Sequence, residues 1–389
     1  MRAVVLRGTC DIAVEEVPDP DIEAPDDAIV AVTSSALCGS DLHMIEGRIG
    51  PDAGLRLGHE PLGVVTRVGP GVSRIQPGQR VVAPTHIFCG TCDMCARGYS
   101  AACLRVNPGR AGAAYGYPGM GGYPGAHAEY LRVPFADANL VTLPGEPGDE
   151  YEDHFVLLAD AFVTGWHATE LAGVGPGDTV AVFGAGTVGL LAVHAAMLRG
   201  AREVYCVDAV PDRLAVAADF GAVPVDAGSH DPVERIRALR APTAIDPLLG
   251  GVDCGIDAVG FQAKDRADWS RENPGQVIDD LVRLVNPAGR LGIAGVFTPL
   301  DQAAQGPARQ GRYEIPWAAL FGQGVRVGFG RTHDVRYTRL LRDLVVSGRA
   351  RPGHVVTRHV GFDDVAHAYT AFDRREPGHV KVVLRPGSH

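Results

Sequence analysis

The segment TVAVFGAGTVGLLAVHAAMLR, residues 179–199, decides the fold class of the chain. Its first five residues are an apolar run typical of a buried strand, and residues 190–199 are an apolar helical run. The turn between them reads Gly-Ala-Gly-Thr-Val-Gly, and a second strand at 203–208 ends in an acidic residue. Strand, Gly-x-Gly-x-x-Gly turn, helix and acid-ended strand together predict a dinucleotide-binding βαβ unit.

The glycine-rich turn indicates how this unit would hold its ligand. Glycines let the backbone approach a pyrophosphate, whose charge then faces the N–H groups and the positive dipole of the following helix. Asp208, nineteen residues after the last glycine, would accept hydrogen bonds from the adenosine ribose. NAD is therefore favoured over NADP, whose 2′-phosphate would meet like charge. Arg213 could weaken that discrimination or pack on the adenine as a solvated helix residue. The expected contacts in the turn are Gly184, Gly186, Thr187, Val188 and Gly189.

Further strands of a parallel sheet are predicted at 252–259 and 290–296, and an amphipathic helix at 213–220. The polar stretch 262–276 is too long for a usual strand–helix connection. Because this stretch carries Lys264 and Arg266, we expect it to cover the adenosine end of the dinucleotide.

The first 155 residues have a different pattern, which predicts mostly β-structure. Apolar runs at 28–33 and 63–68 are broken by Gly and Pro turns, and the turn at 77–80 leads into another strand. Residues 107–126 are rich in Gly, Pro and Tyr and predict an irregular, exposed excursion. From about Val325 the pattern returns to short strands, with one helix predicted at 363–372.

Four of the eight cysteines lie in one short stretch, Cys89-x2-Cys92-x2-Cys95-x7-Cys103. Two-residue gaps let successive thiolates reach one ion from a tight loop, and a fourth thiolate closes a tetrahedron. Such a closed all-sulfur site predicts a structural zinc ion. The alternatives are a disulfide cluster and a chance grouping.

A second metal signature lies upstream, where Cys38 is followed twenty-one residues later by His59. A catalytic zinc needs three protein ligands and an open fourth position, and these two residues are credible first and second ligands. Taken alone, a buried cysteine and a surface histidine would be the commoner reading. The neighbouring four-cysteine loop gives the pair more weight.

Composition bounds the remaining possibilities. The 389 residues are enough for two domains, and the net charge of −10, with no Lys/Arg-rich run, argues against nucleic acid as a partner. We find no leader-like start and no long apolar run, which argues against a membrane protein and predicts a cytoplasmic one. A reducing compartment also suits thiolates that are kept free for metal.

With these motifs in hand, the chain resembles the medium-chain zinc-dependent alcohol dehydrogenase family from end to end. Gly58-His59-Glu60, the four-cysteine loop and the glycine-rich turn occur in the family's order and spacing. Within the family the likeness is closest to glutathione-independent formaldehyde dehydrogenases and formaldehyde dismutases, as residues 107–112, 115–117 and 257–261 indicate.

The resemblance implies an α/β architecture with a GroES-like, mostly-β catalytic domain and a Rossmann domain built on a doubly wound parallel sheet. The catalytic domain would span 1–160 and hold both zinc sites, the NAD-binding domain 161–325, and residues 326–389 would return to the catalytic domain. It also suggests a homo-oligomer, specifically a homotetramer.

The resemblance supplies the third catalytic ligand, Asp160, at a place where many relatives have a cysteine. The alternative for this residue is a solvated helix cap. Asp41 should hold the free ring nitrogen of His59, while Glu60 is either a water-mediated neighbour or a transient ligand. Ser40 should take the alcohol proton and pass it through the ribose toward His43 at the surface. On spacing alone these two would be a turn residue and an exposed histidine.

The remaining cofactor contacts also follow from the resemblance, and the return segment 330–332 would close the nicotinamide side. Lys264 and Arg266 stand where the subgroup tends to carry an arginine and a histidine, so the retention of NAD through turnover is left open. His86 and His167 are read as core or rim histidines. The further expected contacts are Gly39, Val259, Ala294, Val296, Gly330 and Thr332.

The leading functional hypothesis is an NAD- and zinc-dependent oxidoreductase acting on a small alcohol or aldehyde. Zinc would polarise the substrate oxygen while hydride passes to or from the nicotinamide ring. If NAD never leaves, the same chemistry becomes dismutation. A second hypothesis is the oxidation or reduction of a larger biosynthetic metabolite with transient use of tightly bound NAD. A binding protein on an inactivated scaffold is disfavoured, because every expected ligand is present.

Overall fold

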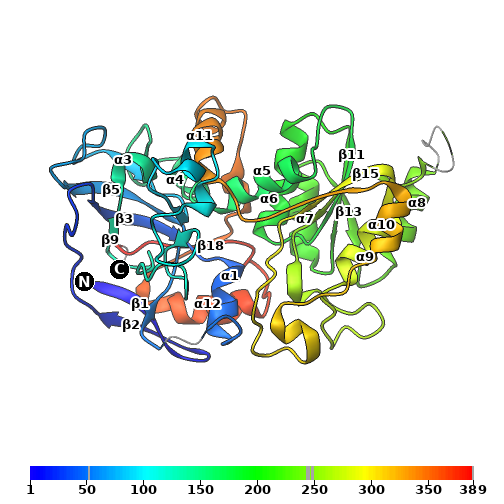
Figure 1. Ribbon diagram of the computed structural model, residues 1–389, viewed down its shortest axis with the longest axis horizontal. Helices are drawn as coiled ribbons and strands as arrows, with labels where there is room; N and C mark the ends of the chain where they lie inside the picture. The colour runs from blue at the N-terminus through cyan, green and yellow to red at the C-terminus, as the bar shows by residue number, and fades with distance from the viewer. Residues whose placement is uncertain (51–52, 242–245, 247–248, 388–389) are drawn as a thin grey trace. The chain divides into compact units, whose positions relative to one another are not determined.

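The computed structural model describes residues 1–50, 53–241, 246 and 249–387. The chain divides into two compact units (Figure 1): Met1–Val163 together with Thr332–His389 form the first, and Thr164–Arg331 form the second. The domain limits predicted from the sequence, at residues 160 and 325, stay a prediction. Among the described residues, no helix is long and apolar enough to cross a membrane.

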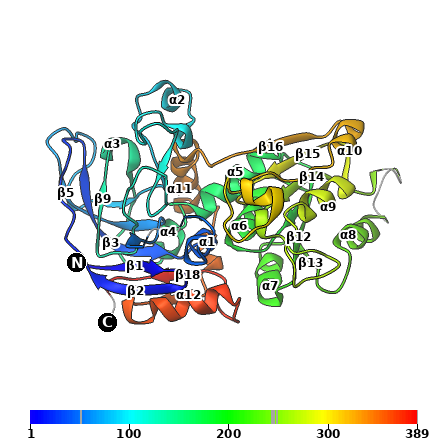
Figure 2. The same cartoon turned by 60° about the horizontal axis from the view of Figure 1, so that its bottom comes forward.

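The second unit is built on a six-stranded sheet whose neighbouring strands are all parallel. Its strand order is β13-β12-β11-β14-β15-β16, the doubly wound order in which the direction of winding reverses between β11 and β14 (Figure 2). The strands are β11 Thr179–Phe183, β12 Glu203–Asp208, β13 Val223–Asp226, β14 Val252–Asp257, β15 Val285–Ile293 and β16 Arg326–Phe329. The Rossmann part of the predicted fold class is confirmed.

Helices on the faces of this sheet explain why the central strand β11 is buried and almost wholly apolar. All five residues of β11 are buried, as expected for a strand covered on both sides. The buried side chains of α9 form one apolar face that packs against β14 and β15. The helices are α5 Ala161–Leu171, α6 Thr187–Leu198, α7 Pro211–Asp219, α8 Pro232–Arg240, α9 Gln276–Leu284 and α10 Trp317–Gln323.

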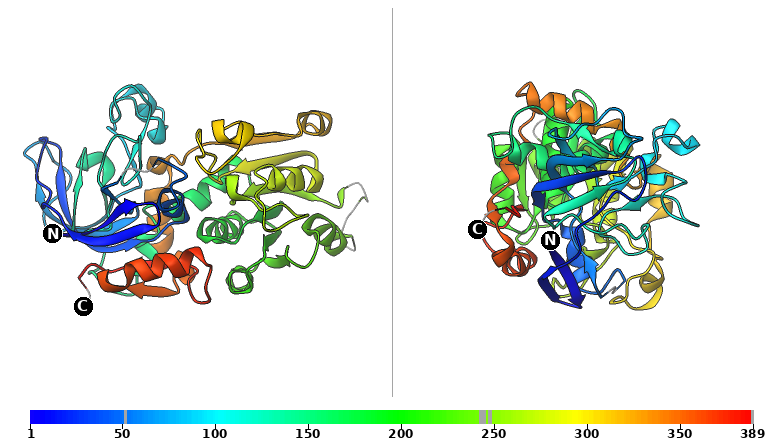
Figure 3. Two further views of the ribbon diagram at one scale, coloured as in Figure 1. Left: turned by 90° about the horizontal axis from the view of Figure 1, so that it is seen from below. Right: turned by 90° about the vertical axis from the view of Figure 1, so that its left-hand side faces the viewer.

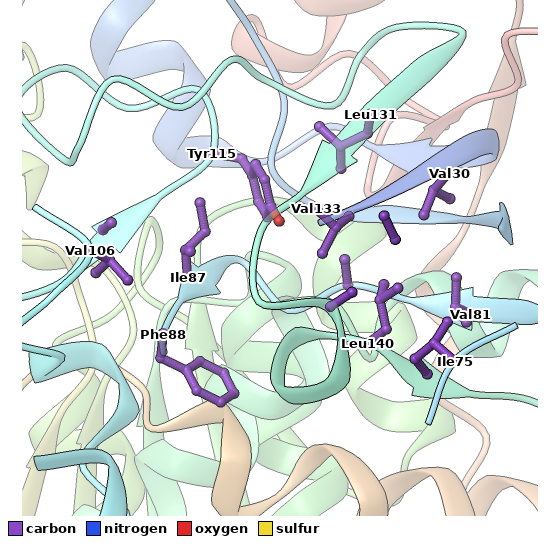
Figure 4. Packing of buried hydrophobic residues seen from close by; sticks show 14 of the residues in the cluster. Val30, Ile75, Val81, Ile87, Phe88, Val106, Tyr115, Leu131, Val133 and Leu140 are labelled. Carbon is purple, nitrogen blue, oxygen red and sulfur yellow. The ribbon is translucent and has the colours of Figure 1, made fainter. Parts of the chain in front are cut away.

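The first unit is mostly β-structure, as the predicted fold class requires. Its larger sheet has the order β10-β6-β5-β3-β18-β17, with β9 also paired to β3, and a smaller sheet has the order β2-β1-β4. The buried face of the larger sheet forms the core drawn in Figure 4, where Val30, Val81 and Leu131 meet. The strands are β1 Arg2–Gly8, β2 Asp11–Glu16, β3 Ala28–Ala36, β4 Leu55–Arg56, β5 Pro61–Val68, β6 Arg80–Val82, β7 His86–Ile87, β8 Ala113–Ala114, β9 Tyr130–Val133, β10 Val141–Thr142, β17 Arg358–Val360 and β18 Val382–Leu384.

The two ends of the chain share a core in this unit. Val4 and Leu6 of β1 pack in one cluster with Val365 and Tyr369 of the last helix, which runs beside β1 and β2 in Figure 3. The helices of the unit are α1 Gly39–Ile45, α2 Asp93–Ala96, α3 Ala136–Asn139, α4 Glu152–Val156, α11 Thr338–Val346 and α12 Val365–Asp373.

Two predictions about the first unit were wrong. The C-terminal segment holds two helices of nine residues rather than one, because α11 buries Leu341, Leu344 and Val345 on one face. The stretch 107–126 is not simply an exposed excursion: β8 pairs with β7, and Tyr115 is 1% exposed. Backbone pairing and a large aromatic side chain hold this segment in the core despite its glycine content.

Candidate metal and cofactor sites

The structure brings together two groups of side chains that could each hold a metal ion. In each group the candidate ligand atoms all lie within 4.8 Å of one another. Both groups lie in the first unit. The first is Cys89, Cys92, Cys95 and Cys103, and the second is Cys38, His59, Glu60 and Asp160.

The four-cysteine group has the dimensions of a zinc site. The Sγ atom of Cys92 lies 3.5 Å from that of Cys95 and 3.8 Å from that of Cys103, and the Sγ atoms of Cys89 and Cys95 are 4.0 Å apart. A tetrahedral ion with Zn–S bonds of about 2.3 Å would place its sulfur atoms about 3.8 Å apart. All eight cysteines are free, which contradicts the disulfide alternative.

Backbone donors favour the thiolate form in this group. The backbone N–H of Leu104 points to the Sγ atom of Cys92 at 3.5 Å, and the N–H of Cys92 points to that of Cys89 at 3.3 Å. Although burial raises the pKa of Cys92, hydrogen bonds from the backbone of Leu104 and Cys95 and from neighbouring cysteine side chains outweigh it and lower the pKa to about 6. A closed, four-thiolate site would leave no position for a substrate, so the structural role stays the prediction for this group.

The second group combines sulfur, nitrogen and oxygen donors around one point. Cys38 precedes α1, His59 precedes β5, and Asp160 lies in the turn between α4 and α5. The Nε2 atom of His59 is 3.5 Å from the Oδ2 atom of Asp160. The imidazole is buried, whereas the Asp160 side chain is 13% exposed. A mixed site that is accessible on one side fits a metal ion with an open coordination position.

The negative charges around His59 favour binding of a cation at this site. Burial lowers the pKa of His59, but the negative charges of Asp41 and Cys38 outweigh burial and raise it well above its usual value. The Nδ1 atom of His59 lies 3.2 Å from the Oδ1 atom of the fully buried Asp41. The structure therefore places Asp41 where the sequence predicted it. A metal ion at Nε2 would take the place of the extra proton.

Glu60 forms a buried ion pair with a lysine. The Nζ atom of Lys381 donates to the Oε1 atom of Glu60 at 2.6 Å and to the backbone oxygen of Leu37 at 2.7 Å. Both charged side chains are fully buried. The sequence did not single out Lys381, which is one of only two lysines in the chain.

Ser40 lies at the metal site, but His43 does not lie at the surface. The Ser40 hydroxyl donates to the Sγ atom of Cys38 at 3.2 Å and is 3.3 Å from the Nε2 atom of His59. Residues three apart share one face of a helix, so α1 places His43 behind Ser40. The predicted surface position of His43 was wrong: α1 buries its last residues, and His43 is 8% exposed. The proton relay itself stays a prediction.

Tyr117 is an aromatic neighbour of the site that the sequence showed only as part of a resemblance. Its ring lies edge-on to the His59 ring, with 5.6 Å between the centroids, and its hydroxyl group interacts with Ser40. Gly116 has a φ of +62°, and a Cβ atom there would lie 2.9 Å from the backbone oxygen of Gly58. The Gly116 turn therefore lets the chain run close to the ligand loop, and the partly buried Tyr117 follows it.

His86 and His167 are both buried, as the reading of core or rim histidines requires. The Nδ1 atom of His86 lies 2.9 Å from the Oδ2 atom of Asp334, which is fully buried. Burial raises the pKa of Asp334, and the charge of Asp160 adds to this rise. The pair thus lies within electrostatic reach of the metal site, although no pattern in the sequence indicated it.

In the second unit, the backbone of the glycine-rich turn requires glycine at two positions. Gly184 has a φ of +95°, and a Cβ atom on Gly189 would lie 1.7 Å from the Gly184 oxygen. The turn leads directly into α6. Asp208 lies beside it, because its Oδ2 atom accepts a hydrogen bond from the Ala185 N–H at 2.6 Å. The anion-binding end of a helix and an acidic residue are thereby brought together.

Two of the three basic residues of the 262–276 stretch, Lys264 and Arg266, form ion pairs within the second unit. Arg266 forms ion pairs with Asp280 and with Asp231, and the Lys264 Nζ atom is 3.9 Å from a Glu272 carboxylate oxygen. These ion pairs favour a structural role for both side chains, and their contact with the dinucleotide stays a prediction.

The other expected cofactor contacts are spread over both units. Ala294 follows β15 directly, and its N–H donates to the Asp257 oxygen. Gly330 follows β16 with a φ of +140°, and Thr332, the first residue of the returning segment, is buried. The positions of the rest are Gly39 at the first residue of α1, Arg213 in α7, Val259 after β14 and Val296 after β15.

Comparisons with known proteins relate the chain to zinc-dependent alcohol dehydrogenases. Residues 24–145 match the alcohol dehydrogenase GroES-like domain, and residues 187–312 match the zinc-binding dehydrogenase domain. A glutathione-independent formaldehyde dehydrogenase from Pseudomonas aeruginosa is 36% identical, over 99% of this chain and 97% of its own. A formaldehyde dismutase from Pseudomonas putida is 32% identical over the same shares. Alcohol dehydrogenase TADH from Thermus sp. ATN1 superposes with a TM-score of 0.83 at 34% identity, covering 99% of both chains.

Proposed function

The chain belongs to the zinc-dependent medium-chain alcohol dehydrogenase family, and we propose that it transfers a hydride between NAD and a small alcohol or aldehyde at a zinc ion held by Cys38, His59 and Asp160. The observation that carries this proposal is the mixed sulfur, nitrogen and oxygen group with one accessible side. When bound, zinc polarises the substrate oxygen and the nicotinamide ring carries the hydride.

Charge balance supports this ligand set. One thiolate from Cys38 and one carboxylate from Asp160 neutralise the two charges of the ion. A carboxylate is a harder and weaker donor toward zinc than a second thiolate, so the ion keeps a strong pull on the substrate oxygen. Glu60 is close enough to compete for the ion, but Lys381 holds it at 2.6 Å.

Ser40 is the residue that handles the substrate proton in this proposal. In the structure its hydroxyl faces the Sγ atom of Cys38 and the Nε2 atom of His59. A metal ion would engage both of these atoms, which leaves the hydroxyl group next to the open position. A substrate alcohol or aldehyde hydrate bound there would meet Ser40 as its proton acceptor.

The choice of NAD over NADP rests on Asp208. Its carboxylate lies at the glycine-rich turn, where it already accepts N–H groups from Ala185, Ala209 and Val210. A 2′-phosphate at this place would meet a carboxylate, whereas the two ribose hydroxyl groups of NAD would donate to it.

The test is a comparison of initial rates with short alcohols and aldehydes, with NAD, with NADP and with no added nucleotide. We expect NAD-dependent turnover of at least one small alcohol or aldehyde, and a rate difference of more than about tenfold between NAD and NADP, equivalent to about 1.4 kcal/mol. Turnover without added NAD, together with NAD released on denaturation, would identify a dismutase. No turnover of any small alcohol or aldehyde by zinc-loaded protein would contradict the proposal.

We further propose that the protein is a homo-oligomer, a tetramer by family likeness. β16 ends the parallel sheet, and large apolar side chains are exposed on it and on α10: Phe329 is 75%, Phe321 92% and Trp317 69% exposed. An exposed edge strand beside an apolar patch is a typical surface for pairing with another copy. Sedimentation should show Phe321→Glu as a smaller species than the wild type, and Leu104→Glu, at another exposed apolar residue, as unchanged. A wild-type monomer would contradict this proposal.

The cysteines support a cytoplasmic location. All eight are free, and the thiolates of the four-cysteine site must remain reduced to hold a metal ion. A reducing compartment meets this need.

A further inference from the structure

A chain of buried polar side chains leads from the interior of the first unit to the metal ligand His59. The Ser35 hydroxyl lies 2.8 Å from the Nδ1 atom of His127, and the Nε2 atom of His127 lies 2.8 Å from the Tyr369 hydroxyl. Tyr369 in turn donates to the Oδ2 atom of Asp41 at 2.9 Å. The other carboxylate oxygen of Asp41 faces the Nδ1 atom of His59 at 3.2 Å.

The direction of every hydrogen bond in this chain is fixed by its last acceptor. A carboxylate can only accept, so the Tyr369 hydroxyl must donate to Asp41. The Tyr369 oxygen is then the acceptor for the Nε2–H group of His127. Burial lowers the pKa of His127, so the ring is neutral and its Nδ1 atom carries no proton. That nitrogen accepts from Ser35, and all three donors point toward Asp41.

The environment makes these bonds strong and hard to replace. Ser35, His127, Tyr369 and Asp41 are each no more than 2% exposed, so solvent does not compete for their polar atoms. Aligned hydrogen bonds in a low-dielectric interior polarise one another, and the effect accumulates on the last acceptor. The Oδ2 atom of Asp41 also accepts the Cys38 N–H at 3.1 Å, so this oxygen receives two donors.

Packing fixes the His127 ring as well as its hydrogen bonds. Gly58, the residue before His59, has a φ of +92°. A Cβ atom on Gly58 would lie 2.4 Å from the His127 ring, a distance that no real side chain tolerates. The ring therefore lies directly against the backbone that presents the metal ligand.

We propose that Tyr369 and His127 are positioning residues that tune the donor strength of His59 toward the catalytic zinc. By donating to Asp41, Tyr369 draws negative charge onto the Oδ2 atom and away from the Oδ1 atom that faces His59. The Nδ1–H group of His59 is then pulled less strongly, and its Nε2 atom is a weaker donor to the metal. A weaker donor leaves the ion a stronger Lewis acid. The proposal rests on the proposed function, because it requires zinc at His59.

The sharpest test is Tyr369→Phe, which removes one hydroxyl group and keeps the ring. Without that donor, Asp41 should pull harder on His59, so zinc should bind more tightly to the catalytic site while kcat falls with little change in KM. We expect each change to be about tenfold, the lower end of the range for partners of metal ligands. Zinc affinity is measured by competition with a chelator that leaves the four-cysteine site loaded.

Tyr115→Phe is the matched control. Tyr115 is also buried in the first unit, and its hydroxyl group has no hydrogen-bond partner among the described residues. This substitution should leave zinc affinity and kcat unchanged. If Tyr369 had a purely structural role, Tyr369→Phe would bind zinc as tightly as the wild type or more weakly. That result would overturn the proposal. A wild type without zinc at this site would instead refute the proposed function.

His127 gives an independent test that does not depend on the folding of the Tyr369 variant. The amide of a glutamine can donate to Tyr369 and accept from Ser35, whereas a phenylalanine can do neither. His127→Gln should therefore keep wild-type zinc affinity and kcat, and His127→Phe should shift both in the direction of Tyr369→Phe. Equal zinc affinities for the two His127 variants would contradict the proposal.

Discussion

Replacing Lys381 by methionine should separate the stability of the metal-free protein from that of the zinc-loaded protein. Methionine keeps the apolar length of the lysine side chain and removes its charge. Glu60 is fully buried and its Oε1 atom accepts from Lys381 at 2.6 Å, so the substitution leaves a buried carboxylate without its cation. The Leu37 oxygen loses its donor as well.

The expected loss of stability depends on whether the Glu60 carboxylate finds another cation. Removing one partner of a buried ion pair costs about 3–5 kcal/mol. Burial already raises the pKa of Glu60 to about 7, although Lys381 opposes that shift. In metal-free protein the charge of His59 offsets part of this cost, and most of the cost should appear. With zinc present, Glu60 belongs to the same ligand group as Cys38 and Asp160 and can bind the ion directly. The loss of stability should then be smaller, and activity should fall because the open position is filled.

The assay is urea unfolding of Lys381→Met with zinc and after chelation, beside activity measurements. Lys264→Met is the matched control, because Lys264 is the other lysine of the chain and its pair with Glu272 is a third exposed, at 3.9 Å. Such a pair is worth about 0–1 kcal/mol. Adding Glu60→Gln to Lys381→Met should restore much of the lost stability. If metal-free Lys381→Met is as stable as the wild type, the reasoning about this buried pair is refuted.

Three further predictions concern the two metal groups and the cofactor turn. Cys92→Ser should lower the free energy of unfolding by several kcal/mol, because metal-binding energy is folding energy. Cys38→Ser should abolish activity and leave the urea midpoint nearly unchanged. Equal destabilisation by the two substitutions would contradict separate roles for the two sites. Asp208→Ala should reduce the ratio of NAD to NADP rates by about tenfold, and an unchanged ratio in steady-state kinetics would remove Asp208 as the selector. Tyr117→Phe should lower kcat more than KM rises, because the Tyr117 hydroxyl group interacts with the serine at the metal site, whereas Tyr115→Phe should not. Equal effects of the two substitutions on kcat would indicate a packing role for Tyr117.

The features that the sequence predicted well are those that depend on short, contiguous segments of the chain. The Gly184–Gly189 turn, the apolar strand before it and the four-cysteine spacing each occupy fewer than twenty residues, and local backbone geometry dictates their residue types. Cys38 and His59 could be paired only with the help of that loop. Asp160 came from family resemblance alone, since a single acidic residue at the start of a helix carries no metal signature.

The partners that the sequence missed are held together only by tertiary contacts. His127 and Tyr369 are 242 residues apart in the chain, and Asp41 and Tyr369 are 328 apart. No local pattern relates positions so far apart. The same limit explains the wrong surface position of His43: α1 has only seven residues, too few to show which of its faces is buried.

The central claim is that Cys38, His59 and Asp160 hold the zinc ion at which substrate reacts. Its most direct test is the zinc content of purified Asp160→Ala, measured with its rate of NAD-dependent turnover. The account predicts that the variant retains one zinc ion per chain, in the four-cysteine site, where the wild type has two. It also predicts that activity falls more than about hundredfold, which is the largest loss usually seen when a residue that hydrogen-bonds a metal ligand is replaced. Two zinc ions per chain and near wild-type turnover in Asp160→Ala would contradict it.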